Sequence, residues 1–262
     1  MNPILKRIIT ALATAGVVVG IILWAKFAWV LPVLIALIAL VQLEFAQMVA
    51  RKYEIMVWPG VIAGVLQLVA VFYFQDSLIL ELFFALSLLA LFGKSSRPVE
   101  ALATTALGFL YVPFMLRHLV DVASGGMMML LYVVALVKFS DMGGFAIGLG
   151  SKKLFGDNHR MCPTVSPNKS WEGMGGSVVA AVLMSLCFMP VTHFSWPKAL
   201  VLGVAAAVVG TLGDLVESRF KRDCGVKDSA TFMPAGLGGF LDMFDSLIFA
   251  PAALNALMRL QF

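Results

Sequence analysis

Long apolar runs are the feature of this sequence that most limits how it can fold. Two early runs, from Ile8 to Leu23 and from Phe27 to Leu43, are at or near the ~20 residues that a helix needs to cross a bilayer core. Hydrophobic residues make up 61% of the chain and charged residues 13%, against about 25% charged residues in a soluble domain. The chain has too little polar surface to cover a globular core. We therefore predict an all-α, polytopic integral membrane protein.

Charged and Pro/Gly-rich stretches divide the apolar sequence into about nine candidate transmembrane helices. Two polar stretches interrupt them, Ser151–Trp171 and Arg219–Gly239. The predicted helices cover residues 8–24, 28–48, 55–74, 77–93, 99–117, 126–150, 172–190, 198–221 and 240–259.

Basic residues are distributed unevenly between the alternate loops of this arrangement. One set of loops carries 14 Lys and Arg and the other carries 4, with Lys138 left inside a helix. Because cytoplasmic loops carry the excess of basic residues, this asymmetry predicts a cytoplasmic N-terminus and places both long polar stretches in the cytoplasm. The net charge of +4 is small and gives no argument for a nucleic-acid partner.

Ionisable residues inside apolar helices mark candidate functional positions, because a charge at membrane depth is costly. Lys138 and Asp141 lie three residues apart and so share a face of the predicted helix 126–150. A site role and a structural ion pair between helices both explain them. Gly144 and Gly148, which follow, fit close helix packing as well as ligand contact.

The polar stretch before the predicted helix 172–190 contains a candidate anion-binding residue. Ser170 can cap this helix, Glu172 suits its positive end and Trp171 suits the headgroup level. These local roles leave Lys169 unexplained. It lies beside the free backbone N–H groups of the helix N-terminus, an arrangement that suits phosphate.

Two pairs of carboxylates lie at the predicted cytoplasmic ends of the last two helices. Asp214 and Glu217, followed by Lys221, recur at helical spacing on one face, and Asp242 and Asp245 are three residues apart on the next helix. Hard oxygen ligands beside clustered Lys and Arg suit Mg²⁺ that bridges a nucleotide phosphate. Helix-dipole stabilisation and a salt-bridged helix face are the alternative explanation.

These charged residues form a longer pattern with their neighbours. Ser218, Lys221-Arg222, Lys227-Asp228 and the pair Asp242 and Asp245 fit S-x-x-K-R-x4-K-D followed by D-R-x-D, and so the region resembles the signature of the phosphatidate cytidylyltransferases. The stretch from Asp141 to Gly173 resembles a second block of that family. Two departures are visible: Pro234–Gly239 reads P-A-G-L-G-G in place of P-G-H-G-G, and Met243 stands in place of the arginine of D-R-x-D.

The resemblance implies a reaction and a set of site residues. The reaction transfers CMP from CTP to phosphatidate and gives CDP-diacylglycerol and pyrophosphate in phospholipid biosynthesis. It implies Mg²⁺ bound by Asp214 and Asp242, with room for a second cation, and Lys227 and Asp228 as further catalytic residues. The residues that it implies in substrate binding are Asp141, Lys169, Glu172, Glu217, Ser218, Lys221, Arg222 and Asp245.

The resemblance also implies how the chain is organised. Its specific motifs fall within residues 138–246, so we expect residues 126–262 to form the catalytic transmembrane region and residues 1–125 the N-terminal helices of one membrane domain. The implied partners are CTP, phosphatidate or a related lipid phosphate, membrane lipids and a second copy of the chain in a homodimer. The implied location is the bacterial inner membrane, with the active site facing the cytoplasm.

The two departures leave other functions open. One is a paralogue that acts on another lipid phosphate, and another is a CTP-dependent polyprenol kinase, which would release CDP in place of pyrophosphate. A non-catalytic member would bind nucleotide or lipid and regulate a partner. A transporter that relays an ion through Lys138 and Asp141 ranks last, because the sequence shows no internal repeat.

Overall fold

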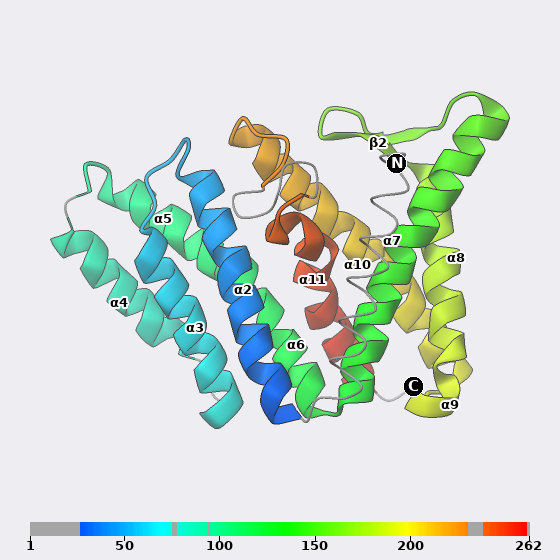
Figure 1. The fold of residues 1–262 in the computed structure, drawn as a ribbon, viewed down its shortest axis with the longest axis horizontal. Helices are drawn as coiled ribbons and strands as arrows, with labels where there is room; N and C mark the ends of the chain where they lie inside the picture. The colour runs from blue at the N-terminus through cyan, green and yellow to red at the C-terminus, as the bar shows by residue number, and fades with distance from the viewer. Residues whose placement is uncertain (1–26, 75–77, 94, 230–237, 261–262) are drawn as a thin grey trace.

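The computed structural model describes residues 27–74, 78–93, 95–229 and 238–260, which form a bundle of helices with one small hairpin (Figure 1). The prediction of an all-α, polytopic membrane protein is confirmed. Within these described ranges, six helical segments are long and apolar enough to cross a bilayer. The helices are α2 (Phe27–Val49), α3 (Val57–Phe74), α4 (Ile79–Phe92), α5 (Pro98–Phe109), α6 (Met115–Ser124), α7 (Met127–Phe155), α8 (Trp171–Cys187), α9 (Met189–Thr192), α10 (Trp196–Asp223) and α11 (Phe240–Arg259).

Eight of the predicted helices have a counterpart within the described residues. The remaining one, residues 8–24, lies outside them. The predicted helix 99–117 is longer in the structure: α5 passes through a π-helical turn, η1 (Leu110–Phe114), and continues as α6 to Ser124. Pro113 lies in that turn. Proline lacks a backbone N–H and its ring crowds the preceding carbonyls, so a widened turn lets the helix continue.

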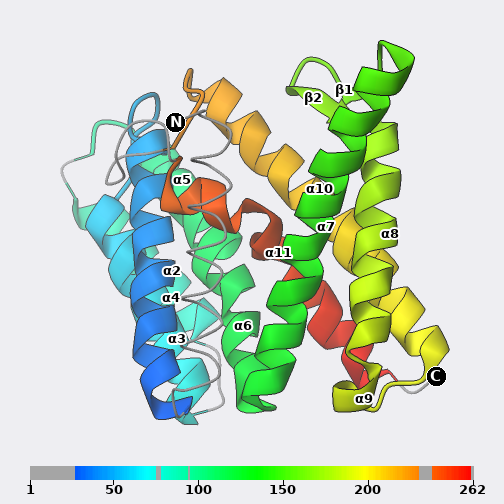
Figure 2. The same cartoon turned by 45° about the vertical axis from the view of Figure 1, so that its right-hand side comes forward.

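Consecutive long helices run in opposite directions, so their connections alternate between the two ends of the bundle (Figure 1). The short strands β1 (Arg160–Cys162) and β2 (Ser166–Ser170) join α7 to α8 and mark what we call the hairpin end. The connections 50–56, 95–97 and 224–229 lie at the same end (Figures 1 and 2). The loops predicted to share the cytoplasmic side are therefore together in space.

Polar contacts tie these connections to one another at the hairpin end. The Glu54 carboxyl accepts hydrogen bonds from the hydroxyls of Ser95 and Ser96 and from the backbone N–H of Arg97. These donors favour the ionised form and lower the pKa of Glu54 to about 2. Lys52 Nζ lies 3.0 Å from Asp223 Oδ1 and so joins the connection after α2 to the end of α10.

The hairpin is an element that the sequence did not predict. β1 and β2 pair antiparallel with an irregular register, in which Arg160 faces Ser170 and Cys162 faces Ser166. Ser170 then caps α8 as predicted, since its Oγ accepts a hydrogen bond from the Gly173 N–H at 3.1 Å. The hairpin thus leads directly into the N-terminus of α8.

Small residues bring α7 and α8 almost into backbone contact. A Cβ on Gly176 of α8 would lie 2.5 Å from Ile147 Cβ and 2.7 Å from the Gly143 carbonyl oxygen, and a Cβ on Gly144 would meet Ser177 Oγ. A Cβ on Gly148 would lie 3.6 Å from Gly173 Cα, an ordinary van der Waals contact. The close helix packing predicted for this segment is thus seen at Gly144, whereas Gly148 has room for a side-chain carbon.

Candidate active site

A cavity of about 700 Å³ opens at the hairpin end, bounded by α7, the hairpin, α8, α10 and α11. All of its lining residues lie between positions 138 and 246. Gly144 and Gly148 are among them, so ligand contact stays open for both, beside the packing role of Gly144. The hairpin, which belongs to the first long polar stretch, supplies part of the lining, and the facing ends of α10 and α11 supply another part. Figure 2 shows the hairpin at the upper ends of α7 and α8.

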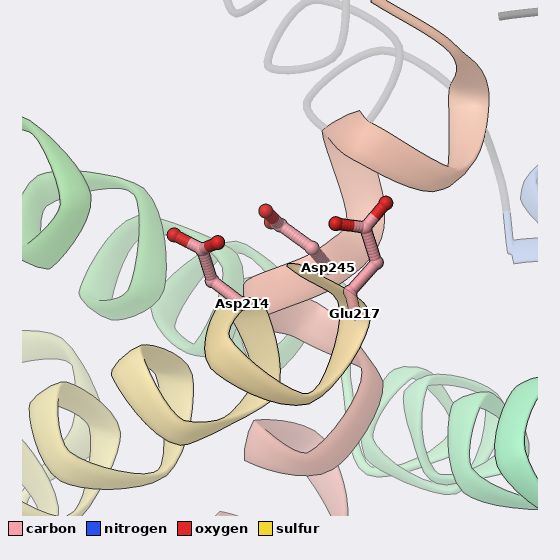
Figure 3. Close-up of side chains that lie close together, drawn as sticks. All are labelled: Asp214, Glu217 and Asp245. Atoms are coloured by element: carbon pink, nitrogen blue, oxygen red, sulfur yellow. The ribbon is translucent and has the colours of Figure 1, made fainter. Parts of the chain in front are cut away.

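Three carboxylates form a cluster between α10 and α11. Asp214 and Glu217 lie one turn apart on α10, Asp245 lies on α11, and one oxygen of each is within 4.8 Å of the others. Figure 3 shows the three side chains projecting into the same space. The helices approach this closely because Gly213 has no side chain: a Cβ there would lie 2.6 Å from the Asp245 carbonyl oxygen.

Two lysines form ion pairs with acids of this region. Lys169 Nζ, from β2, lies 2.7 Å from Asp214 Oδ2 and donates a hydrogen bond to the Thr211 carbonyl oxygen at 3.1 Å. Lys221 Nζ pairs with Glu217 and lies 2.7 Å from Asp242 Oδ1. The phosphate-binding candidate and the carboxylates, predicted separately from the sequence, are thus in direct contact.

The cluster fits a small divalent cation by its chemistry. All of its donors are carboxylate oxygens, which Mg²⁺ prefers. Glu217 is fully buried, and its Oε1 accepts no hydrogen bond from the residues that the structure describes. An ionisable oxygen in this position needs a cation or a proton, since burial of an unpaired carboxylate is costly. Asp214, Glu217 and Asp245 are therefore the residues that could hold the metal.

Asp242 has a second role in shaping the end of α11. Its Oδ2 accepts hydrogen bonds from the backbone N–H groups of Gly239, at 2.6 Å, and Ser229, at 3.2 Å. These bonds satisfy donors at the start of the helix. Asp242 also lines the cavity, so it combines a capping role with access to a ligand.

The predicted site residues fall into three groups in the structure. Asp141, Lys169, Asp214, Asp242 and Asp245 line the cavity. Glu217, Ser218 and Lys221 contact those acids without lining the cavity: Ser218 Oγ donates to Asp214 Oδ1 at 3.3 Å. The remaining residues lie apart from the cavity, namely Glu172, Arg222, Lys227 and Asp228.

The residues outside the cavity have contacts or positions of their own. Glu172 Oε1 lies 2.7 Å from His159 Nδ1, so it fastens the start of the hairpin to α8. Arg222 Nη1 donates to the Val226 carbonyl oxygen at 3.3 Å. Lys227 and Asp228 are exposed in the segment after α10. Their substrate-binding and catalytic roles stay predictions.

Among the cavity residues that the sequence analysis did not assign to the site are Lys138, Lys152, Asn158 and Arg160. For Lys138 the sequence leaves a site role and a structural ion pair with Asp141 both open. The others lie in a polar stretch whose fold the sequence did not reveal. Excess basic residues in that stretch were the signal available, and they were used to predict orientation.

Glu44 is a further residue for which the sequence gave no role. It is fully buried on α2, and its Oε2 accepts a hydrogen bond from the Leu241 N–H at 2.9 Å. That donor belongs to the first turn of α11, where backbone N–H groups have no partner within the helix. Glu44 therefore links the N-terminal helices to the helix that carries Asp242 and Asp245.

Replacing Glu44 is expected to destabilise the protein. Glu44→Ala leaves the buried Leu241 N–H without an acceptor, which costs about 1–3 kcal/mol. Thermal unfolding in detergent measures the change, and Glu81→Ala, at an exposed position of α4, is the matched control. Equal unfolding temperatures for the two variants would show that Glu44 does not support α11.

The fold and the cavity define the class of the protein: a polytopic α-helical membrane protein whose helices enclose carboxylates paired with lysines. Within that class, the chain belongs to the Cytidylyltransferase family, whose model matches residues 5–261.

Curated relatives match the chain over part of its length. It is similar to the phosphatidate cytidylyltransferase of Staphylococcus saprophyticus, with 35% identity over 161 residues, which is 60% of this chain and 56% of the relative. The protein of the same name from Staphylococcus aureus strain COL is 37% identical over 150 residues, or 56% of this chain and 55% of the relative. The protein of the same name from Mycobacterium bovis is 45% identical over 120 residues, which is 45% of this chain and 36% of the relative. The chain thus spans about half the length, or less, of these relatives.

Proposed function

We propose that this protein transfers CMP from CTP to phosphatidate, giving CDP-diacylglycerol and pyrophosphate. The observation that carries the proposal is the contact of Lys169 with Asp214 beside Glu217 and Asp245, at a cavity between helices in a chain of the Cytidylyltransferase family. The names of the relatives, phosphatidate cytidylyltransferases, support the choice of substrates.

The chemistry needs charge neutralisation more than a strong base. An oxygen of the lipid phosphate attacks the α-phosphorus of CTP, and the bond between that phosphorus and the oxygen bridging to the β-phosphate breaks. The attacking phosphate is already an anion, so the main obstacle is its repulsion by the triphosphate. Fixed cations aimed at the developing charge lower that barrier.

We assign residues that line the cavity, and others that contact those residues, to this reaction as follows. Asp214, Glu217 and Asp245 would hold Mg²⁺, with Asp242 as the further ligand that the sequence predicts and room for a second cation. When bound there, Mg²⁺ supplies positive charge to the triphosphate. Lys169 and Lys221 are held by these acids and bind the CTP phosphates.

The proposal includes an orientation of the protein in the membrane. The hairpin end faces the cytoplasm of a bacterial cell, at the inner membrane, because the loops gathered there carry the excess of Lys and Arg. CTP then arrives from water, and phosphatidate enters sideways from the bilayer. The homodimer that the family resemblance implies is part of this proposal.

Labelled CTP tests the proposal directly. Purified protein in detergent with phosphatidate and Mg²⁺ is expected to move the label into the lipid phase and to release pyrophosphate in equal amount. Chelating the divalent cation with EDTA is expected to reduce turnover to background, and added Mg²⁺ to restore it, because the triphosphate charge is otherwise uncompensated.

The products separate this reaction from the other candidates. Release of CDP in place of pyrophosphate would identify a kinase and overturn the proposal. Binding of CTP without any turnover, over a panel of lipid phosphates, would leave a non-catalytic nucleotide-binding member of the family.

A further inference from the structure

Lys138 is a cation that the proposed reaction has not used. It lies in the middle of α7, 14 residues before Lys152, and so is about 21 Å deeper along the helix axis. Both lysines line the cavity. The Lys138 side chain is 40% exposed, although a charge within a membrane helix is costly unless it meets a partner or a functional ligand.

Lys138 is less firmly paired than the other two lysines of the site. Lys169 and Lys221 each lie 2.7 Å from a carboxylate oxygen, and their side chains are 20% and 12% exposed. Lys138 Nζ lies 3.6 Å from Asp141 Oδ2, beyond a good hydrogen bond. Lys138 Nζ donates its shorter contact to a neutral group, the Met243 carbonyl oxygen at 2.8 Å. The ammonium group of Lys138 is thus only weakly paired and is accessible to an anionic ligand.

Between Lys138 and the hairpin end, the α7 wall of the cavity carries two apolar side chains. Phe145 and Leu149 follow Lys138 by 7 and 11 residues, which places all three on one face of α7. Both line the cavity, and they are 62% and 53% exposed. A nucleotide offers little to such a wall, whereas the glycerol and acyl groups of a lipid match it.

We propose that Lys138 binds the phosphate of the lipid substrate, so that the deep end of the cavity is the lipid-phosphate subsite and the hairpin side is the nucleotide subsite. This inference rests on the proposed function. The ligand chemistry is a phosphate monoester that carries acyl chains. The Asp141 carboxylate, at 3.6 Å, keeps the lysine amine directed into the cavity.

Steady-state kinetics test the assignment. Lys138→Met keeps the length of the side chain and removes its charge. For this variant, the KM for dioctanoyl phosphatidate is expected to rise about 10- to 100-fold, because one hydrogen bond to a charged group is lost. The KM for CTP is expected to stay within about twofold of the wild-type value. Lys138→Arg is expected to recover most of the loss. The control is Lys153→Met, an exposed residue of the same helix outside the cavity lining.

A binding measurement separates failure of this inference from failure of the proposed function. Dioctanoyl phosphatidate is expected to raise the unfolding temperature of the wild type and not of Lys138→Met, whereas CTP raises both. If the two proteins differ in this way but the wild type shows no turnover, the lipid-phosphate subsite is supported and the proposed reaction is wrong. If turnover occurs and Lys138→Met has unchanged kinetics for both substrates, the reaction stands and the subsite falls.

Two more outcomes would overturn the subsite. A parallel rise in the KM for CTP would show that Lys138 serves the nucleotide. Glycerol 3-phosphate carries the same phosphate monoester without acyl chains, and if it stabilises the wild type as well as dioctanoyl phosphatidate does, the site binds free phosphates and is not specific for a lipid.

Discussion

Asp214→Asn is expected to lower CMP transfer by about 10²–10³-fold, a loss comparable to that of one preorganised electrostatic group at a reacting centre. The substitution keeps the size of the side chain and removes its charge. Asp214 is the one residue of the cluster that joins Glu217 and Asp245 on one side to Lys169 on the other. Its loss therefore disturbs the metal ligands and the position of a phosphate-binding cation together.

Transfer of labelled CMP into lipid measures the effect, at saturating CTP and phosphatidate. The matched control is Glu81→Gln, which also removes one carboxylate from an exposed position, on α4 far from the cavity. Unfolding temperatures of both variants show whether the fold is intact. A folded Asp214→Asn protein with at least half of the wild-type rate would exclude the cluster from the reaction.

Gly213→Ala is expected to cost about 10²-fold in activity through a single added methyl group. The new Cβ would lie 2.6 Å from the Asp245 carbonyl oxygen, which is backbone and cannot rotate away. The two helices must separate, and Asp245 moves with α11. Displacement of a reacting group by about 1 Å reduces rates on this scale, and overpacking costs about 1–3 kcal/mol of stability.

Gly175→Ala is the matched control for this variant. Gly175 also lies in a helix, and a Cβ there would have no neighbour within 4 Å. Both substitutions favour helix formation by about 1 kcal/mol. A difference in activity or unfolding temperature between the two variants therefore reports the contact of the new Cβ with the neighbouring helix. Activity and unfolding temperature are measured for each. Equal behaviour of the two variants would show that the approach of α10 to α11 does not limit the site.

The sequence predicted the helices well because one physical rule dominates a membrane protein. Backbone groups in a bilayer must be paired within the segment, so an apolar run of sufficient length becomes a helix. The structure differs from the prediction mainly where the chain is not a continuous apolar run or where proline interrupts a helix. The hairpin Arg160–Ser170 lies outside the apolar runs, and its strands have too few residues to show alternation. The π-turn at Pro113 continues a helix that was expected to end at 117.

The sequence predicted which residues form the site better than it predicted which of those residues contact one another. Helical spacing put Asp214 and Glu217 on one face, but it could not show which acids of the next helix would meet them. The structure brings Asp245 to that cluster and Asp242 to Lys221. The difference follows from the packing of α10 on α11, a tertiary contact that local spacing does not encode.

The contacts of Lys169 and Lys221 have a consequence for how ligands enter. Both ammonium groups occupy oxygens of the acids that a divalent cation would take, Asp214 and Glu217 among them. A divalent cation on these acids would compete with the lysines for the carboxylates, and an ammonium group that it released would be free to pair with a phosphate. Binding of metal and of nucleotide would then include an exchange of ionic partners. Because coupling between two ligands is reciprocal, each strengthens the other by the same factor.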